Sequence, residues 1–234
     1  MVQLLDIGNT FTRIAVWDGG DFVDLRRLPT NELEREFSGD EKENISRVAA
    51  CVCPSVKSAL SGYGIDFISA SNHHSKVDFS LVDTSTLGAD RVANAIAAAE
   101  YYPLPAAVID CGTAVTLEVI DGMFRFAGGA IAPGRRLLRQ ALANGTAQLP
   151  EIPLTDFIPG DIGRNTVDAI RFGVDAGIVG VVREWLRILQ KKYSGLTVIL
   201  TGGDAGFLAP EFSEAVVADD KFTLHGIRIA GGFY

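Results

Sequence analysis

Two short acidic stretches have residue types that suit the binding of phosphate. Residues 6–10 read DIGNT and follow the apolar run VQLL, and residues 110–113 read DCGT and follow AAVI. A glycine lets backbone N–H groups approach a phosphate, and a threonine or asparagine adds a side-chain hydrogen bond. The aspartate at the end of the strand can hold a hydrated Mg²⁺. Taken alone, either stretch could equally be an ordinary Asp-x-Gly turn.

The surroundings of the two stretches repeat along the chain. Each copy is predicted to run strand, Asp-x-Gly with a following Thr, strand, Asp-Gly turn and strand. The first copy comprises VQLLDI, RIAVWDG and DFVDLRRL, and the second comprises AAVID, AVTLEVIDG and MFRFAGGAIA. An internal repeat predicts two domains of the same topology and makes the plain-turn interpretation the lesser one. Two such hairpins facing each other across a cleft would hold the β- and γ-phosphates of a nucleotide from both sides.

Helices are expected to fill the rest of each half, because apolar residues recur there at three- and four-residue spacing. Pro103 and Pro105 bracket a natural joint, so the domains are expected to span residues 1–104 and 105–234. The predicted helices cover residues 31–37, 54–64, 89–102, 134–145 and 165–195.

A third glycine-containing motif, TGGDAG, follows the apolar run LTVIL. Gly202 and Gly203 could let an adenine ring or an α-phosphate lie against the backbone before the next helix. Equally, they could form a strand-to-helix loop that needs a positive φ. The motifs G-x-x-x-x-G-K-[ST] and G-x-G-x-x-G are absent from the sequence, so a nucleotide site would be of the two-hairpin kind.

The motif GADR, residues 88–91, places an acid and a base at the start of an alanine-rich helix. Asp90 could accept the proton of a substrate hydroxyl, and Arg91 could pair with an anionic group. The helix N-terminus is expected to lower the pKa of Asp90, which phosphoryl transfer tolerates because its transition state is loose. Without other context, a helix-terminal acid beside a solvated arginine is the favoured interpretation.

The motif GRNT, residues 163–166, precedes the longest predicted helix. Asn165 or Thr166 is therefore expected to cap that helix. A hydrogen bond to a substrate is the functional alternative.

The charge balance argues against nucleic acid as a partner. The formal net charge is −8, and the basic residues form only short pairs such as Arg135-Arg136 and Lys191-Lys192. A phosphate backbone requires clustered Lys and Arg. A phosphorylated small molecule is still compatible with this acidity, since backbone N–H groups and a metal can bind it.

Composition also favours a cytoplasmic protein without a membrane partner. Asp6 interrupts the first apolar run before it resembles a signal peptide, and no run is long enough to span a bilayer. The three cysteines, Cys51, Cys53 and Cys111, suit a reducing compartment better than a disulfide framework. Their spacing makes a zinc site improbable.

Taken together, the motifs resemble those of the type III pantothenate kinases, in the acetate kinase, sugar kinase, Hsp70 and actin superfamily. DIGNT, GADR, DCGT, GGAIAPG, TAQLP, IGRNT and TGGDAG occur in the family's order over nearly the whole chain. GADR together with GGAIAPG and IGRNT is specific within the superfamily. The resemblance implies an α/β fold of two similar ribonuclease H-like (actin-like ATPase) domains. Each would be a mixed sheet with helices on both faces, and the nucleotide cleft would lie between them.

The resemblance further implies transfer of the γ-phosphate of ATP to the hydroxyl of pantothenate, giving 4'-phosphopantothenate for coenzyme A synthesis. Asp90 would be the general base, Asp6 would bind Mg²⁺, and Asp110 would bind the K⁺ or NH₄⁺ that the family uses. The protein would be a homodimer, with pantothenate close to the subunit interface. The implied ATP contacts are Asp6, Ile7, Gly8, Asn9, Thr10, Phe11, Thr12, Arg13, Gly112, Thr113, Gly202 and Gly203. The implied pantothenate contacts are Gly88, Ala89, Asp90, Arg91 and Thr166.

One departure and two alternatives accompany this interpretation. Leu81 stands where the family usually has an aromatic residue, so one wall of the implied pantothenate pocket is expected to differ. The first alternative is a catalytically weak member that acts as a transcription accessory factor, and it predicts loss of an essential acid. Asp6, Asp90 and Asp110 are all present, which favours catalysis. The second is another kinase or a filament-forming ATPase of the superfamily, although GADR favours a small-molecule pocket over polymer contacts.

Overall fold

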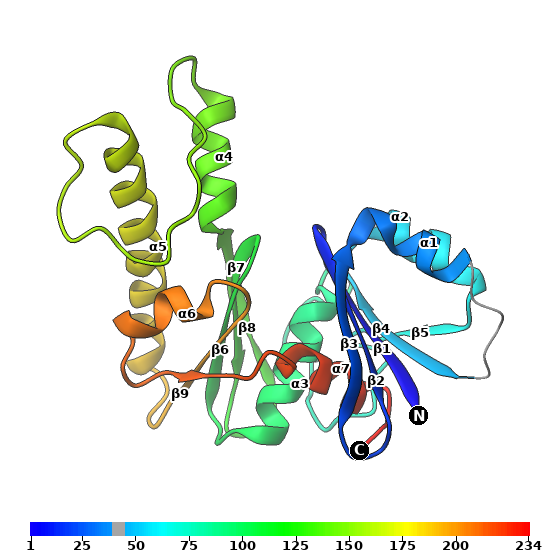
Figure 1. The fold of residues 1–234 in the computed structure, drawn as a ribbon. Helices are drawn as coiled ribbons and strands as arrows, with labels where there is room; N and C mark the ends of the chain where they lie inside the picture. The colour runs from blue at the N-terminus through cyan, green and yellow to red at the C-terminus, as the bar shows by residue number, and fades with distance from the viewer. Residues whose placement is uncertain (39–44) are drawn as a thin grey trace. The chain divides into compact units, whose positions relative to one another are not determined.

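The computed structural model describes residues 1–38 and 45–234 and contains two five-stranded sheets (Figure 1). The strand order is β3-β2-β1-β4-β5 in the first sheet and β10-β9-β6-β7-β8 in the second. The strands are β1 (Val2–Ile7), β2 (Phe11–Trp17), β3 (Phe22–Pro29), β4 (Ser46–Cys51), β5 (Ile65–Phe67), β6 (Ala106–Cys111), β7 (Ala114–Ile120), β8 (Phe126–Pro133), β9 (Thr197–Thr201) and β10 (Val216–Val217).

Both sheets are mixed and share one topology. In the first, β2 lies antiparallel to β1 and β3 antiparallel to β2, whereas β4 lies parallel to β1 and β5 parallel to β4. In the second, β7 lies antiparallel to β6, whereas β9 lies parallel to β6 and β10 parallel to β9. The predicted repeat is confirmed. The sequence analysis assigned no strand to β4, β5 or β10, which lie outside the repeated motif; β5 and β10 are also short, with three and two residues.

The helices lie largely where the spacing of apolar residues predicted them. The stretch 54–64 divides into α2 and a short 3-10 helix, and α5 ends at Gln190 instead of continuing to residue 195. No helix of the described residues is both long and apolar enough to span a membrane. The helices are α1 (Leu33–Ser38), α2 (Pro54–Ala59), α3 (Ala89–Tyr101), α4 (Arg135–Gly145), α5 (Thr166–Gln190), α6 (Ala205–Leu208) and α7 (Phe222–Ala230), with 3-10 helices at Thr30–Glu32, Leu60–Gly62 and Ala209–Glu211.

Helix α7 has no counterpart among the predicted elements. Its sequence, FTLHGIRIA, contains a glycine at a position where glycine weakens a helix. That glycine, Gly226, lies against α3, and a Cβ atom there would collide with the carbonyl oxygen of Ala93. The close packing of α7 against α3 therefore requires a glycine at position 226, and the same glycine makes α7 hard to predict from the sequence.

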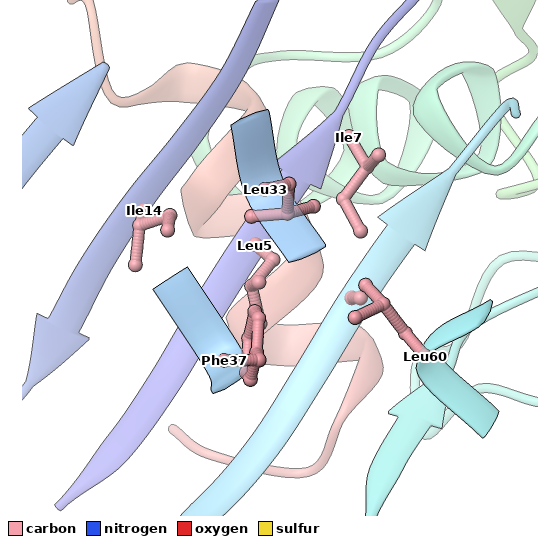
Figure 2. Packing of buried hydrophobic residues seen from close by; sticks show 7 residues of the cluster. Leu5, Ile7, Ile14, Leu33, Phe37 and Leu60 are labelled. Atoms are coloured by element: carbon pink, nitrogen blue, oxygen red, sulfur yellow. The ribbon is translucent and has the colours of Figure 1, made fainter. Parts of the chain in front are cut away.

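Helices cover both faces of the first sheet. On one face, Leu5, Ile7 and Ile14 pack against residues of α1 and against Leu60 of the 3-10 helix that follows α2, in a buried cluster (Figure 2). Successive residues of a strand point to opposite faces, so the neighbouring residues face α7, which contacts β1 and β4. Burial of each large aliphatic or aromatic side chain contributes about 1.5–3 kcal/mol. The cluster comprises Leu5, Ile7, Ile14, Leu33, Phe37, Ala49 and Leu60.

The contacts divide the chain into two compact units. The first comprises Met1–Tyr102, Gly122–Gly128 and Asp220–Tyr234, and the second comprises Pro103–Asp121 and Gly129–Asp219. The last segment joins the first unit because α7 packs on α3 and β1. The domain limits 1–104 and 105–234 stay a prediction. Each unit is described by itself below.

Candidate active site

In the first unit, the DIGNT stretch forms the turn between β1 and β2. Asp6 lies opposite Arg13 in the strand pair, and Nε and Nη2 of Arg13 donate hydrogen bonds to Oδ2 of Asp6 at 3.2 and 3.1 Å. The backbone N–H of Gly8 donates to the carbonyl oxygen of Phe11 at 3.1 Å. A Cβ atom on Gly8 would lie 3.0 Å from that oxygen, so the tightness of the turn favours glycine.

Two residues that the sequence analysis missed support this turn. The hydroxyl of Thr30 donates to the carbonyl oxygen of Gly8 at 2.8 Å, and it lies 3.1 Å from the hydroxyl of buried Thr12. The thiol of Cys53 also donates to the Gly8 carbonyl, at 3.3 Å. Both come from segments distant in the sequence, so no local pattern could have revealed them. Asn9, Thr10 and Phe11 are exposed.

The GADR motif forms the start of α3 and adjoins the same turn. The side chain of Val52 lies 3.7 Å from the position of a Cβ atom on Gly88, and the N–H of Val52 donates to the carbonyl oxygen of Ile7. Oδ1 of Asp90 accepts a hydrogen bond from the backbone N–H of Arg91 at 2.8 Å. The same Oδ1 lies 2.6 Å from the Cβ position of Gly88, so a side chain there would displace the carboxylate.

The expectation that the helix N-terminus lowers the pKa of Asp90 is wrong. Burial raises the pKa of this carboxyl, and the negative charge of Asp6 raises it further. The hydrogen bond from the Arg91 backbone and the charge of Arg91 oppose the rise without cancelling it. Burial also raises the pKa of Asp6, against the charge and hydrogen bonds of Arg13. Asp90 is therefore a stronger base than a solvated carboxylate, and it lies within electrostatic reach of Asp6.

In the second unit, the DCGT stretch forms the turn between β6 and β7. The N–H of Gly112 donates to the carbonyl oxygen of Ala114 at 3.0 Å. The glycine loop after β9 lies directly against this turn. Gly202 has a φ of +88°, and a Cβ atom there would collide with Oδ1 of Asp110 and lie 2.7 Å from the carbonyl oxygen of Cys111. This contact and the positive φ both require glycine at position 202.

The GGAIAPG motif also contacts the DCGT turn, through its last residue, Gly134. The N–H of Gly134, the residue before α4, donates to the carbonyl oxygen of Thr113 at 2.9 Å. A Cβ atom on Gly134 would lie 2.7 Å from the same oxygen and would collide with the carbonyl oxygen of Gly112. The turn is thus held between two glycine-containing backbone segments.

The remaining predicted site residues of the second unit lie at the start of α5. Asn165 is confirmed as the N-cap, because its side chain accepts a hydrogen bond from the N–H of Asp168 at 2.9 Å. Thr166 is the exposed first residue of the helix. In sum, the first unit contains residues 6–13 and 88–91. The second contains residues 110–113 and 202–203 in mutual contact, together with Thr166.

The described part of the chain has no cluster of three or more His, Cys, Asp or Glu arranged to hold a metal. Mg²⁺ at kinase sites is commonly bound by one or two carboxylates together with substrate phosphates and water. A single acid at the end of a strand, such as Asp6, fits a metal of that kind.

Two sheets of one topology, each with an acid at its first turn, define the fold of the actin-like ATPases and sugar kinases. A Campylobacter jejuni protein assigned to the Baf family of transcriptional activators has a TM-score of 0.67 at 20% identity, covering 97% of this chain and 96% of that one. The ADPNP-bound activator of 2-hydroxyisocaproyl-CoA dehydratase from Clostridium difficile has a TM-score of 0.55 at 16% identity, covering 98% and 92%. At these identities the likeness establishes the fold alone.

Sequence comparison identifies the family within this fold. The sequence model of the type III pantothenate kinases matches residues 3–187. The type III pantothenate kinase of Akkermansia muciniphila is 34% identical over 98% of this chain and 97% of its own length. That of Fervidobacterium nodosum is 31% identical over 97% and 95%. The chain belongs to the type III pantothenate kinase family.

Proposed function

We propose that the protein is a pantothenate kinase, which transfers the γ-phosphate of ATP to the hydroxyl of pantothenate. The observation that carries the proposal is that the start of α3, with Asp90, adjoins the turn that contains Asp6, because Val52 contacts both Gly88 and the carbonyl oxygen of Ile7. A partly buried carboxyl, whose pKa is raised by desolvation, lies within electrostatic reach of the acid at the proposed phosphate-binding turn. This arrangement places a proton acceptor near a candidate metal ligand, which suits transfer of a phosphate to an alcohol.

Asp90 would accept the proton of the pantothenate hydroxyl as the oxygen attacks the γ-phosphorus. Its carboxylate is oriented by the hydrogen bond from the Arg91 backbone and by the close fit over Gly88. The guanidinium of Arg91 would pair with the carboxylate of pantothenate. Gly88 and Ala89 would line the same pocket, and Thr166 would contribute a hydrogen bond to pantothenate.

The two turns would share the nucleotide phosphates. Asp6 would hold Mg²⁺, which when bound neutralises charge on the phosphates. The ATP contacts of the first unit would come from residues 6–13, and those of the second from Gly112, Thr113, Gly202 and Gly203.

Asp110 would bind a monovalent cation, K⁺ or NH₄⁺. Its carboxylate lies against Gly202, and the carbonyl oxygen of Cys111 lies close to the same glycine. Hard oxygen donors of this kind suit an alkali cation.

We further propose a cytoplasmic homodimer with no nucleic-acid or membrane partner. The net charge of −8 supports the absence of nucleic-acid binding. The domains would span residues 1–104 and 105–234. A role as a transcription accessory factor is not favoured, because Asp6, Asp90 and Asp110 are all retained.

A coupled kinase assay with ATP, Mg²⁺, K⁺ and pantothenate tests the proposal, with other hydroxy acids run beside pantothenate. Asp90→Asn should lower kcat by about 10²–10⁴-fold while ATP still binds. Glu100→Gln is the matched control, since it removes an exposed acid near the other end of α3. Absence of pantothenate phosphorylation by the native protein would refute the function, and full activity of Asp90→Asn would refute the role of Asp90.

A further inference from the structure

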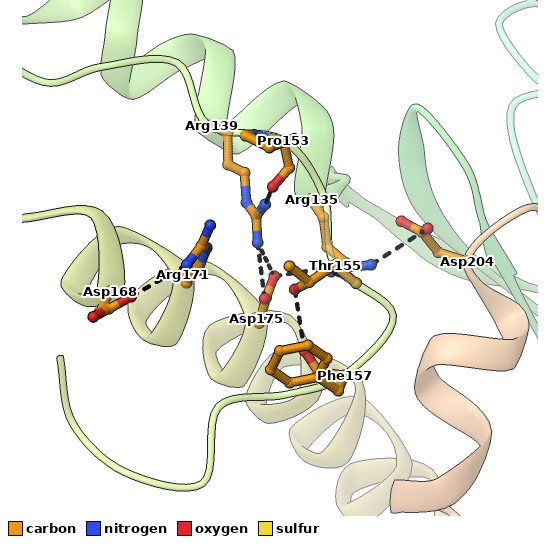
Figure 3. A network of polar contacts seen from close by, with 9 residues as sticks. All are labelled: Arg135, Arg139, Pro153, Thr155, Phe157, Asp168, Arg171, Asp175 and Asp204. Carbon is orange, nitrogen blue, oxygen red and sulfur yellow. Dashed lines mark hydrogen bonds and ion pairs between the residues drawn. The ribbon is translucent and has the colours of Figure 1, made fainter.

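A buried ionic network joins four segments of the second unit (Figure 3). Nε of Arg135 donates to Oδ1 of Asp175 at 3.0 Å, and Nη2 of Arg139 donates to both carboxylate oxygens of Asp175 at 2.8 Å. Asp175 is fully buried, and the side chain of Arg135 is 2% exposed. Nη2 of Arg135 also donates to the carbonyl oxygen of Thr155 at 2.6 Å, and its guanidinium lies 3.3 Å from the centroid of the Phe207 ring.

The charges in this network direct Arg135 toward the glycine loop. Arg135 and Arg139 share the single negative charge of Asp175. Nη1 of Arg135 lies 3.5 Å from Oδ1 of Asp204, whose side chain is 24% exposed. Burial raises the pKa of Asp204, while the charges of Arg135 and Arg136 oppose that rise. Asp204 is therefore an end of the network that solvent reaches, and it directly follows Gly202 and Gly203.

Arg135 also lies next to the other segment that contacts the DCGT turn. It follows Gly134, whose N–H donates to the carbonyl oxygen of Thr113. On the other side, the N–H of Asp204 donates to the carbonyl oxygen of Cys111 at 2.9 Å. One buried side chain thus connects the two backbone segments that hold the turn. A buried ion pair adds little net stability, but it fixes the geometry of the groups that it joins.

We propose that Arg135 is a positioning residue for the nucleotide, which acts by holding the Asp204 loop and the start of α4 against the Asp110–Thr113 turn. Asp175 is its buried counter-charge. The sequence analysis noted Arg135 only as half of a short basic pair and quoted Asp204 only within TGGDAG. The inference rests on the proposed function, since it assigns the turn to phosphate binding.

Loss of this link would weaken nucleotide binding more than it would slow phosphate transfer. Without Arg135, both segments must become ordered when the nucleotide binds, and the loss of their conformational entropy lowers the affinity. In Arg135→Gln, we expect the Kd for Mg-ADP and the KM for ATP to rise about tenfold, the size expected for one charge-assisted contact. The KM for pantothenate should stay within about twofold of the native value, and kcat within about threefold. The reason is that Arg135 is neither the proposed base nor part of the proposed pantothenate pocket.

The test measures Mg-ADP binding by calorimetry and steady-state kinetics on the native protein and its variants. Arg136→Gln is the matched control, because it removes the same charge at the next, exposed position. Its Kd should change less than about twofold. Asp204→Ala removes the ion pair from its exposed end while leaving the Asp175 pair, and should raise the Kd about fivefold with little change in Tm. If Arg135→Gln does not fold, the Kd of Asp204→Ala for Mg-ADP still tests whether the ion pair supports nucleotide binding.

A double-mutant cycle separates positioning from general structural damage. Adding Asp204→Ala to Arg135→Gln should change the Kd by less than about twofold, because the link is already broken. Full additivity, an unchanged Kd in either single variant, or equal rises in the KM of both substrates would overturn the inference. So would an equal effect of Arg136→Gln.

The binding series also distinguishes this inference from the proposed function. A native protein that binds Mg-ADP but does not phosphorylate pantothenate refutes the function, while the variant series still decides the role of Arg135. A native protein that binds no Mg-ADP refutes both. Normal kinase activity in folded Arg135→Gln, with an unchanged Kd, refutes this inference alone.

Discussion

In the first hairpin the aspartate at the end of the strand lies opposite an arginine, whereas in the second it lies opposite a threonine. Asp6 is paired across the strands with Arg13, and Asp110 is paired across the strands with Thr116. The guanidinium of Arg13 contacts Asp6 directly. In the second hairpin, the backbone of the Gly202 loop lies against the Asp110 carboxylate.

This difference indicates how one backbone plan can serve two purposes. The strand order is the same in both units and each turn contains a glycine, but the residue opposite the acid differs. An acid beside an arginine has much of its charge already compensated, and it fits a metal that arrives with its own phosphate ligands. An acid that lies against a glycine loop, with the carbonyl oxygen of Cys111 close to the same glycine, would fit a monovalent cation held by the protein itself. The variants below test whether the two acids do have separate roles.

Among the variants that compare the two hairpins, the largest expected effect is the loss of monovalent-cation dependence in the second hairpin. Asp110→Ala should lower kcat/KM by about 10²–10³-fold and remove the difference between K⁺ and Na⁺. Asp6→Asn should also impair catalysis but should keep the ratio of rates in K⁺ and Na⁺. Initial rates in each salt at equal ionic strength measure both effects. Equal native rates in K⁺ and Na⁺ would contradict the assignment of Asp110.

A second prediction concerns the tightness of the two turns. Gly134→Ala places a Cβ atom among backbone atoms that cannot move aside, and should cost about 1–3 kcal/mol of unfolding free energy. Gly8→Ala meets only one oxygen, at 3.0 Å, and should cost less. Thermal unfolding measures both. Gly173→Ala, within α5 and with open space around it, should instead stabilise slightly, by about 0.5–1 kcal/mol. A Tm loss in Gly8→Ala as large as in Gly134→Ala would show that the turns are equally constrained.

A third prediction uses the pKa of Asp90, which is raised by burial and by Asp6. As a general base Asp90 must be ionised, so kcat should fall as the pH falls through its raised pKa. Arg91 lowers this pKa, so Arg91→Gln should move the acid limb of the kcat profile to higher pH. Asp6→Asn should move it to lower pH, because the charge that raises the pKa is removed. The profile of Glu100→Gln should match the native one, and unshifted profiles in both site variants would exclude Asp90 as the titrating group.

The smallest effect expected is on stability in the first hairpin. Burial raises the folded-state pKa of Asp6 above its unfolded value, so ionised Asp6 destabilises the fold above that pKa, and the cost fades as the pH falls. Arg13→Gln should raise this pKa further and lower the unfolding free energy at neutral pH by about 1 kcal/mol. Part of the loss should return on acidification. Chemical denaturation at two pH values measures it, and Arg187→Gln, which breaks an exposed pair, should cost about 0.5 kcal/mol or less at both.

Local signals in the sequence were strong for the elements that repeat. Apolar runs ending at Asp6 and Asp110 predicted β1 and β6, and the apolar spacing after Asn165 predicted α5 and its cap. Prediction from the sequence failed where the conformation or pKa of a residue depends on residues distant in the sequence. Gly226 obscured α7 because it accommodates α3, and the helix-terminal position of Asp90 gave the wrong direction for its pKa because burial and Asp6 act on it from elsewhere.

By itself, the sequence determined the two acid-tipped hairpins, the family and the identities of the proposed acids, because these depend on short runs of neighbouring residues. Only the tertiary structure decided that Asp6 acts on Asp90, that Gly202 and Gly134 enclose one turn, and that Arg135 connects Asp175 to Asp204. The physical reason is that charge, burial and steric contact act through space. The residues that they join here lie tens of positions apart along the chain.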